Sequence, residues 1–444
     1  MNEKKQLKKN LGVATAMATV VGCVIGSGVF FKPQAIYSAT GGAPGLGMLA
    51  WIITGLASIA AALTFAEVAI MIPKTGGIVA YLEEIYGPIV GFLAGWVQVL
   101  LFYPAMVAAL AVIFAQQAEL FIGAGFTVPL AMCAIILIVF LNSLGSSVGG
   151  NVQIIFTICK LIPLILLMVF GFVKGSGENP IFSYMLADGL SPGVVLGQLM
   201  VSVLFAFEGW TNVGAIAGEM KNPGKDLPLA IVGGVSMIMA VYFVINIAYL
   251  WVLPASELAT LAAPASAVAL KIFGNVGGKI ISVGIMVSVF GACNGFILSG
   301  SRVVYSLAES GNFPCSKLLS KLNKAQVPTN SIVLVGLLGC LYTITGQFNL
   351  LTDLAIISSW AFYTLTFIGV KKLRRTKPNA KRTYKVPLYP VIPILASVSG
   401  AYVIFNQLFM AGKQSTFLSL GSIAIALIGI PVYMGIKKKK SKKV

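Results

Sequence analysis

Residues 20–33 read VVGCVIGSGVFFKP, an apolar stretch with three glycines, Gly22, Gly26 and Gly28, within seven positions. Glycine inside a helix costs about 1 kcal/mol relative to alanine. In lipid, non-helical backbone persists only where protein or a water-filled cavity satisfies its polar groups. The stretch therefore predicts a membrane helix that is interrupted at Gly26-Ser27-Gly28, and we expect the substrate to bind at the interruption.

An interruption at this point has a definite chemical preference. Unwound backbone exposes amide N–H groups at the start of the second half-helix, and the helix dipole adds partial positive charge there. Both favour an anion such as a carboxylate, and the Ser27 hydroxyl adds a further donor. The glycines alone are also compatible with close helix packing through small residues.

The composition sets the protein class. The chain has 444 residues, of which 58% are hydrophobic and 10% are charged, whereas soluble domains carry about 25% charged residues. Runs of about 20 apolar residues cross a bilayer as helices. The strands of a membrane barrel would alternate apolar and polar residues, and these runs are continuous. We therefore expect an all-α integral membrane protein.

We count twelve spans and a single transporter domain, 1–444, because no non-apolar stretch is long enough for an inserted domain. The spans lie near 12–39, 46–72, 88–117, 126–144, 150–173, 194–219, 228–253, 276–308, 329–346, 350–370, 387–410 and 415–436. No phosphate-binding G-x-x-x-x-G-K-[ST] loop occurs, so the energy is expected to come from a gradient or from exchange.

The net charge of +18 is concentrated in short flanks of the spans. Lysines crowd the N-terminus between Lys4 and Lys9 and the C-terminus at 437–443, and eight basic residues lie in 371–385. Such flanks mark the cytoplasmic side of a membrane protein. We expect both termini in the cytoplasm and a lipid bilayer as the partner, with no nucleic acid.

The sixth span, 194–219, carries a second interruption in LFAFEGWTNVGAIAGE (204–219). Glu208 lies in mid-span and is followed by Gly209. A carboxylate inside the membrane is costly and indicates a functional site, although it is also compatible with an acid that only hydrates a polar cavity. Breaks at matching positions of two halves, 12–173 and 194–370, indicate a binding site near the bilayer midplane.

Lys160 lies ten residues into the fifth span, which corresponds to a depth of about 15 Å. A lysine at this depth needs partners or loses its proton. Two interpretations overlap, a structural tether between helices and a fixed or titratable cation at the transport site.

These motifs resemble the amino acid–polyamine–organocation transporters, in particular the L-type amino acid transporter branch and its bacterial exchangers of small neutral amino acids. The resemblance covers nearly the whole chain. It rests on GCVIGSGVFFKP (22–33), AEVAIMIPKTGGIVAYLEEIYGP (66–88), CKLIP (159–163), FAFEGWTNVGAIAGEMKNPGKDLPLAI (205–231) and FGACNGFILSGSRVVYSLAESGNFP (290–314).

The resemblance implies a LeuT-type inverted repeat of five plus five helices, with spans one and six unwound in the middle and helices 11 and 12 within 387–436. It also implies site roles. The substrate carboxylate is expected on Gly26, Ser27 and Gly28. The substrate amino group is expected on the carbonyls of Val24, Phe205 and Glu208.

The same resemblance implies a gate and a pocket. Phe205 is expected to close the site from outside, and the remaining gate or pocket residues are Phe207, Gly209, Tyr242 and Ser359. Lys160 is expected to stand where sodium binds in sodium-coupled relatives, where it would bridge Gly22 to Ser288.

The expected function is sodium-independent exchange of small neutral L-amino acids (Ala, Ser, Cys, Thr, Gly) by alternating access in a bacterial plasma membrane. Large-substrate members usually have glycine where this chain has Glu208, so a smaller pocket is expected. The loop 119–128 has no cysteine for a heavy subunit, and none is expected. Alternatives are a proton-coupled symporter, an antiporter of cationic amino acids or polyamines, and an amino acid sensor.

An enzyme is not expected. The chain has no histidine and no cysteine pair at metal spacing, and we expect neither a metal nor a cofactor. The sequence does not indicate an oligomeric state.

Overall fold

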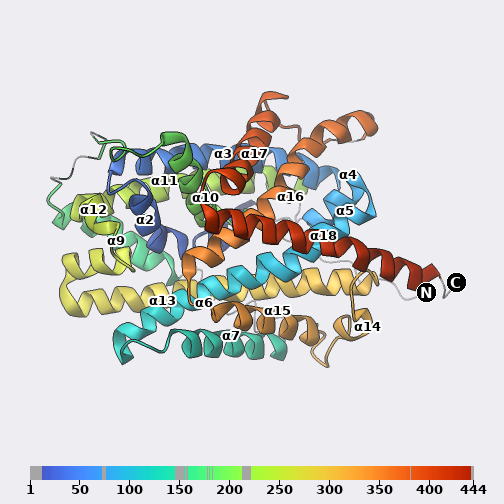
Figure 1. Cartoon of the computed structure of the whole chain (residues 1–444), viewed down its shortest axis with the longest axis horizontal. Helices are drawn as coiled ribbons and strands as arrows, with labels where there is room; N and C mark the ends of the chain where they lie inside the picture. Colours follow the sequence, from blue (N-terminus) through green and yellow to red (C-terminus); the bar gives the residue numbers. More distant parts are fainter. Residues whose placement is uncertain are drawn as a thin grey trace.

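The computed structural model describes residues 13–72, 77–145, 156, 159–177, 179, 181–182, 184–212, 222–380 and 382–441. All regular structure in these ranges is helical. Figure 1 shows a bundle whose long helices, α6 and α13 among them, run side by side, with α12 at one end and α14 at the other. The C-terminal turns of α18 lie at the α14 end, which we call the basic end; the opposite end is the α12 end.

The helix bounds are as follows. The first half contains α1 (Val13–Val24), α2 (Gly28–Ala39), α3 (Pro44–Met71), α4 (Ile78–Tyr86), α5 (Pro88–Val97), the π-helical turn η1 (Gln98–Phe102), α6 (Tyr103–Ile122), α7 (Thr127–Leu144) and α9 (Leu161–Lys174). The remainder contains α10 (Pro192–Phe207), α11 (Pro223–Val252), α12 (Ala255–Leu258), α13 (Pro264–Glu309), α14 (Ser316–Leu319), α15 (Thr329–Thr343), α16 (Phe348–Thr376), α17 (Val391–Phe409) and α18 (Lys413–Ser441).

Within the described ranges, nine helices are long and apolar enough to cross a membrane, and α9 and α15 are shorter apolar helices. The described part of the chain is therefore all-helical, and its long apolar helices indicate a multi-pass membrane protein. The count of twelve crossings and the LeuT-type repeat stay predictions. α13 joins two helices across a kink at Gly274, where φ is 70° and ψ is −173°. The predicted span 276–308 matches the helix after the kink, whereas the helix before it, from Pro264 to the kink, was not predicted.

Lipid-facing surface is evident on α7 and α18. Ile136, Leu137 and Phe140 on α7 are large apolar side chains that are about half exposed or more. Leu427 and Ile428 on α18 are equally exposed. Contiguous exposed apolar surface of this kind requires an apolar environment, which a bilayer supplies.

The first predicted interruption is present. α1 ends at Val24 and α2 begins at Gly28, with non-helical backbone between them. The amides of Phe30 and Phe31 already bond to the Ser27 carbonyl at 3.1 Å, so the second half-helix starts immediately after the break. The single span predicted at 12–39 is thus two half-helices.

The second interruption is also present. α10 ends at Phe207, and Glu208 adopts extended backbone with ψ of 142°. Gly209 follows with φ of 119°, a left-handed conformation that glycine adopts without the steric cost of a Cβ atom. The chain can leave the helical conformation here because residue 209 is glycine.

The two half-helices α2 and α10 touch through backbone. A Cβ atom on Gly28 would lie 2.4 Å from the Ala206 Cα atom and 2.6 Å from its Cβ atom. A Cβ atom on Gly26 would lie 3.5 Å from the Ala292 Cβ atom and 3.8 Å from the Val24 carbonyl oxygen, both ordinary contacts. The packing explanation for glycines therefore applies to Gly28, and Gly26 remains available for a ligand-binding role.

At the basic end, the carboxylate of Glu67 on α3 ties three segments together. Arg374 of α16 forms two hydrogen bonds to it, Nε to Oε1 at 2.8 Å and Nη2 to Oε2 at 2.6 Å. The amide of Val386 donates to Oε2 at 2.7 Å, and Arg382 Nε lies 3.8 Å from Oε1. The basic loop that precedes α17 is thus anchored on a buried acid of the bundle.

We predict that Glu67→Gln destabilises the protein by about 3 kcal/mol, because removing one partner of a buried pair leaves the other charge uncompensated. The melting temperature in detergent measures this. Glu309→Gln is the control, since Glu309 is exposed and accepts a single hydrogen bond, from Tyr305. Equal melting temperatures for the two variants would contradict the anchoring role.

We predict that Gly28→Ala forces α2 and α10 apart and costs about 1–3 kcal/mol, the usual range for overpacking. Gly26→Ala, two residues away in the same break, should melt within experimental error of the wild type. The comparison uses the melting temperature of each variant in detergent. A larger loss for Gly26→Ala than for Gly28→Ala would show that the contact with Ala206 does not limit the packing.

Candidate functional site

The broken ends of the two spans meet at one hydroxyl group. The Tyr242 hydroxyl of α11 lies 3.0 Å from the carbonyl oxygen of Ala206 and 3.3 Å from that of Val24. These carbonyls belong to the last turns of α10 and α1, where helices leave acceptors without an internal donor. The two interruptions, far apart in sequence, therefore form one locus in the fold.

The start of α2 offers donors. The amides of Gly26, Ser27 and Gly28 have no acceptor among the described residues. The Ser27 side chain is 1% exposed, and its hydroxyl has no hydrogen-bond partner in the part of the chain that the structure describes. Unpaired buried donors are costly, so these groups are available to an anion, and the predicted binding of a carboxylate here stays a prediction.

The end of α1 offers acceptors, and Lys160 occupies two of them. The Lys160 Nζ atom donates to the carbonyl oxygen of Gly22, and also to that of Ile25 at 2.8 Å. Its side chain is 0% exposed. The ammonium group therefore lies at the negative end of the α1 dipole, where a cation is stabilised.

Ser288, which was predicted to contact Lys160, does not form a hydrogen bond with it. Its hydroxyl is buried but has no hydrogen-bond partner among the described residues. The structure thus brings Lys160 to Gly22, while the Ser288 hydroxyl forms no hydrogen bond with the lysine.

Glu208 lies in a short polar chain at the second break. The Tyr363 hydroxyl of α16 donates to Glu208 Oε1 at 2.9 Å, and the Gly209 amide lies 3.3 Å from the same oxygen. The Thr211 hydroxyl is 3.4 Å from the Tyr363 hydroxyl. Glu208 is 3% exposed, so its polar atoms depend on these neighbours.

The other predicted pocket residues are all buried near this locus, with different contacts. The Phe207 ring packs on Tyr242 at 5.3 Å between centroids. Tyr242 directs its hydroxyl to the helix-end carbonyls described above. The Ser359 hydroxyl donates to its own helix, to the carbonyl of Ile356 at 3.2 Å.

Phe205 belongs to an aromatic layer between the breaks and the α12 end. Its ring contacts Phe348 at 5.4 Å, and Phe348 contacts Phe31 at 6.1 Å. Lys32 Nζ lies 5.3 Å from the Phe205 ring centre and 5.2 Å from that of Phe348. This arrangement is compatible with the predicted gate.

Sequence reasoning missed Lys32 as a site residue, because a lysine near the end of an apolar span reads as a charged flank. The side chain is 0% exposed. Its Nζ atom donates to Thr352 Oγ1 at 2.6 Å and to Asn349 Oδ1 at 3.2 Å, and lies 3.7 Å from Asp353 Oδ1. The signal available in the sequence was its position only four residues after Gly28.

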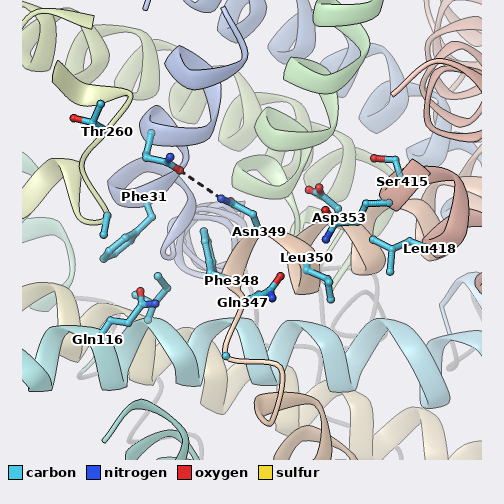
Figure 2. Close-up of a pocket in the computed structure, with 15 residues that line it drawn as sticks. Phe31, Gln116, Thr260, Gln347, Phe348, Asn349, Leu350, Asp353, Ser415 and Leu418 are labelled. Carbon is cyan, nitrogen blue, oxygen red and sulfur yellow. Dashed lines mark hydrogen bonds between the residues drawn. The ribbon is translucent and has the colours of Figure 1, made fainter. Parts of the chain in front are cut away.

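A polar cavity of about 490 Å³ lies beyond this layer. Figure 2 shows Phe31 and Phe348 among its walls, with Asn349 and Asp353 projecting from the first turns of α16. The cavity is lined by Phe31, Gln34, Ile113, Gln116, Thr260, Ala262, Gly346, Gln347, Phe348, Asn349, Leu350, Asp353, Gln414, Ser415 and Leu418. It includes neither the first break nor Glu208, so it is a separate compartment.

Comparison with known proteins identifies the family. The family model described as amino acid permease matches residues 11–432. The serine/threonine exchanger SteT of Bacillus subtilis (strain 168) is 39% identical over 443 residues, covering 99% of each chain.

Two mammalian relatives are more distant. The b(0,+)-type amino acid transporter 1 of Homo sapiens is 31% identical, with 96% of this chain and 88% of the relative covered. The large neutral amino acids transporter small subunit 2 of Mus musculus is 31% identical, with 96% and 81% covered. The chain belongs to the amino acid permease family, and it is accordingly a membrane transporter of amino acids and not an enzyme.

Proposed function

We propose that this chain exchanges small neutral L-amino acids, serine and threonine among them, across a bacterial plasma membrane by alternating access. The observation that carries the proposal is that two sets of backbone groups lie together at the first break. One set is the amides at the start of α2, which have no acceptor among the described residues, and the other is the carbonyls at the ends of α1 and α10. An amino acid has one group for each: its carboxylate fits the amides, and its ammonium group fits the carbonyls. The similarity to a serine/threonine exchanger over the full chain supports the same substrate class.

Lys160 supports exchange without sodium. Its ammonium group already supplies a positive charge to the carbonyls of Gly22 and Ile25. A sodium ion at these oxygens would place two cations in one buried site, where like charges repel strongly. We propose that Lys160 permanently takes the part that sodium plays in sodium-coupled relatives.

Glu208 supports a preference for small substrates. Its carboxylate occupies the space beside Gly209 and is held by Tyr363. Large-substrate members of the family that this chain resembles usually have glycine at this position. The larger Glu208 side chain would therefore leave less room for the side chain of the substrate. We also propose the two five-helix halves, 12–173 and 194–370, as the framework of the site, with cytoplasmic termini and no heavy subunit.

A proton-coupled symporter is the second candidate, because the Glu208–Tyr363–Thr211 chain holds a buried acid at the site. It predicts uptake into empty vesicles driven by a pH gradient alone. Exchange predicts no such uptake.

We expect labelled serine to enter proteoliposomes many times faster when they contain unlabelled serine than when they are empty. The reason is that an obligatory exchanger returns to the outward-facing state only with substrate bound. The initial rate of uptake is the measurement, with and without a sodium gradient, and with vesicles loaded with arginine as a control. Equal uptake into empty and serine-loaded vesicles would refute exchange, and dependence on the sodium gradient would refute the role given to Lys160.

Lys160→Ala should lower serine exchange by about tenfold or more, because hydrogen bonds to charged groups contribute about 1.5–3 kcal/mol each. Folded yield should fall much less. Lys174→Ala is the matched control, since Lys174 also donates to a backbone carbonyl, that of Ile272 at 3.1 Å, but lies away from both breaks. Size-exclusion profiles give the folded yield, and unchanged exchange in Lys160→Ala would remove the lysine from the transport site.

A further inference from the structure

The polar cavity at the α12 end has the size of a small-molecule site. Its volume of about 490 Å³ lies within the range of about 300–1,000 Å³ that is usual for ligand pockets. The α12 end is opposite the basic end, so it is the end expected to face outside under the positive-inside rule. A solute that arrives from outside meets this cavity before it reaches the breaks.

Asp353 is the one charged side chain among the described residues that line the cavity. Its carboxylate is only loosely paired, because the distance from Lys32 Nζ to Oδ1 is 3.7 Å, whereas charge-assisted N–H···O bonds are about 2.7–2.9 Å long. The Lys32 ammonium group makes shorter contacts with Thr352 and Asn349. The Asp353 side chain is 29% exposed, so it retains capacity to bind a cation from the cavity.

Amide side chains supply the complementary groups. Gln34, Gln347, Asn349 and Gln414 line the cavity, and each side-chain amide can donate to a carboxylate and accept from a hydroxyl or ammonium group. The Oδ1 atom of Asn349 accepts from Lys32, but its Nδ2 atom makes only a long hydrogen bond, to Gln34 Oε1 at 3.4 Å, among the described residues. One carboxylate and several neutral donors match a zwitterion of zero net charge better than an anion.

The floor of the cavity connects it to the breaks. Phe348 lines the cavity and also contacts Phe205, which lies three residues before Glu208. One aromatic layer, with Lys32 between the rings, therefore separates a ligand on Asp353 from the broken helices.

We propose that this cavity is a second binding site, which receives a neutral amino acid from outside and holds its ammonium group on Asp353 before the aromatic layer opens. The inference rests on the proposed exchange function and adds a separate site to it. Lys32 remains 3.7 Å from the Asp353 carboxylate. The ammonium group of the ligand would therefore form the shorter hydrogen bond to this carboxylate.

The test measures the KM for serine separately at each side of the membrane, in proteoliposomes in which the orientation of the protein is known. Asp353→Asn should raise the KM for serine added at the α12 end by about tenfold, the loss expected for one charged hydrogen bond, and leave the KM at the basic end unchanged. Asp188→Asn is the matched control, because Asp188 is an exposed acid of the loop that pairs with Thr40, just after α2. It should change neither KM.

Three results would overturn the proposal. An unchanged KM at the α12 end in Asp353→Asn would show that the cavity does not bind substrate. Opposite shifts of the two KM values would show that Lys32 and Asp353 act only as a latch between conformations. Equal rises in Asp353→Asn and Asp188→Asn would show that only the surface charge matters.

Equilibrium binding of labelled serine to the purified protein separates this inference from the proposed function. The wild type and Asp353→Glu should bind two serines per chain, and Asp353→Asn should bind one. One bound serine in both the wild type and Asp353→Asn overturns the second site and leaves the exchange function intact. No bound serine in the wild type overturns both.

Discussion

Backbone groups at a helix end inside a bilayer must find partners within the protein, and this requirement governs the whole site. α1 stops at Val24, and the carbonyls of Gly22, Val24 and Ile25 receive no backbone donor from the described residues. Lys160 satisfies those of Gly22 and Ile25, and Tyr242 lies at that of Val24. Span one can remain open in the middle because neighbouring helices carry these two side chains. The amides on the other side of the break receive no such partner from the described residues, which makes them the candidate donors to a ligand.

α16 is held by charged groups near both of its ends. Lys32 of α2 binds Asn349 and Thr352 close to its first turn, and Glu67 of α3 binds Arg374 close to its last. In each contact one partner comes from the first half of the chain, Lys32 as a donor and Glu67 as an acceptor, and both contacts are formed in this structure. The two contacts therefore fix both ends of α16 to helices of the first half of the chain.

The sequence was sufficient to predict both interruptions, because Gly26-Ser27-Gly28 and Glu208-Gly209 break local rules for membrane helices. It also predicted that Lys160 needs partners at its depth. It did not predict Lys32 or Asp353, since burial of a lysine near a span end depends on packing by Phe205 and Phe348, which are distant in sequence. The part of α13 before the kink at Gly274 was not predicted, because Pro264–Gly274 is too short to cross a bilayer and span length was the signal used.

The geometry of Tyr242 bears on how an ammonium group is bound. A hydroxyl has one hydrogen, but it faces two carbonyl oxygens, those of Ala206 and Val24. Tyr242 can donate to only one of them at a time, and the longer distance, 3.3 Å to Val24, indicates the weaker bond. Under the proposed function, a substrate ammonium group with three hydrogens would donate to the other carbonyl without displacing the tyrosine. A zwitterionic amino acid would then pair with both the amides of α2 and the carbonyls of α1 and α10, whereas a simple acid or a simple amine would pair with only one of these sets.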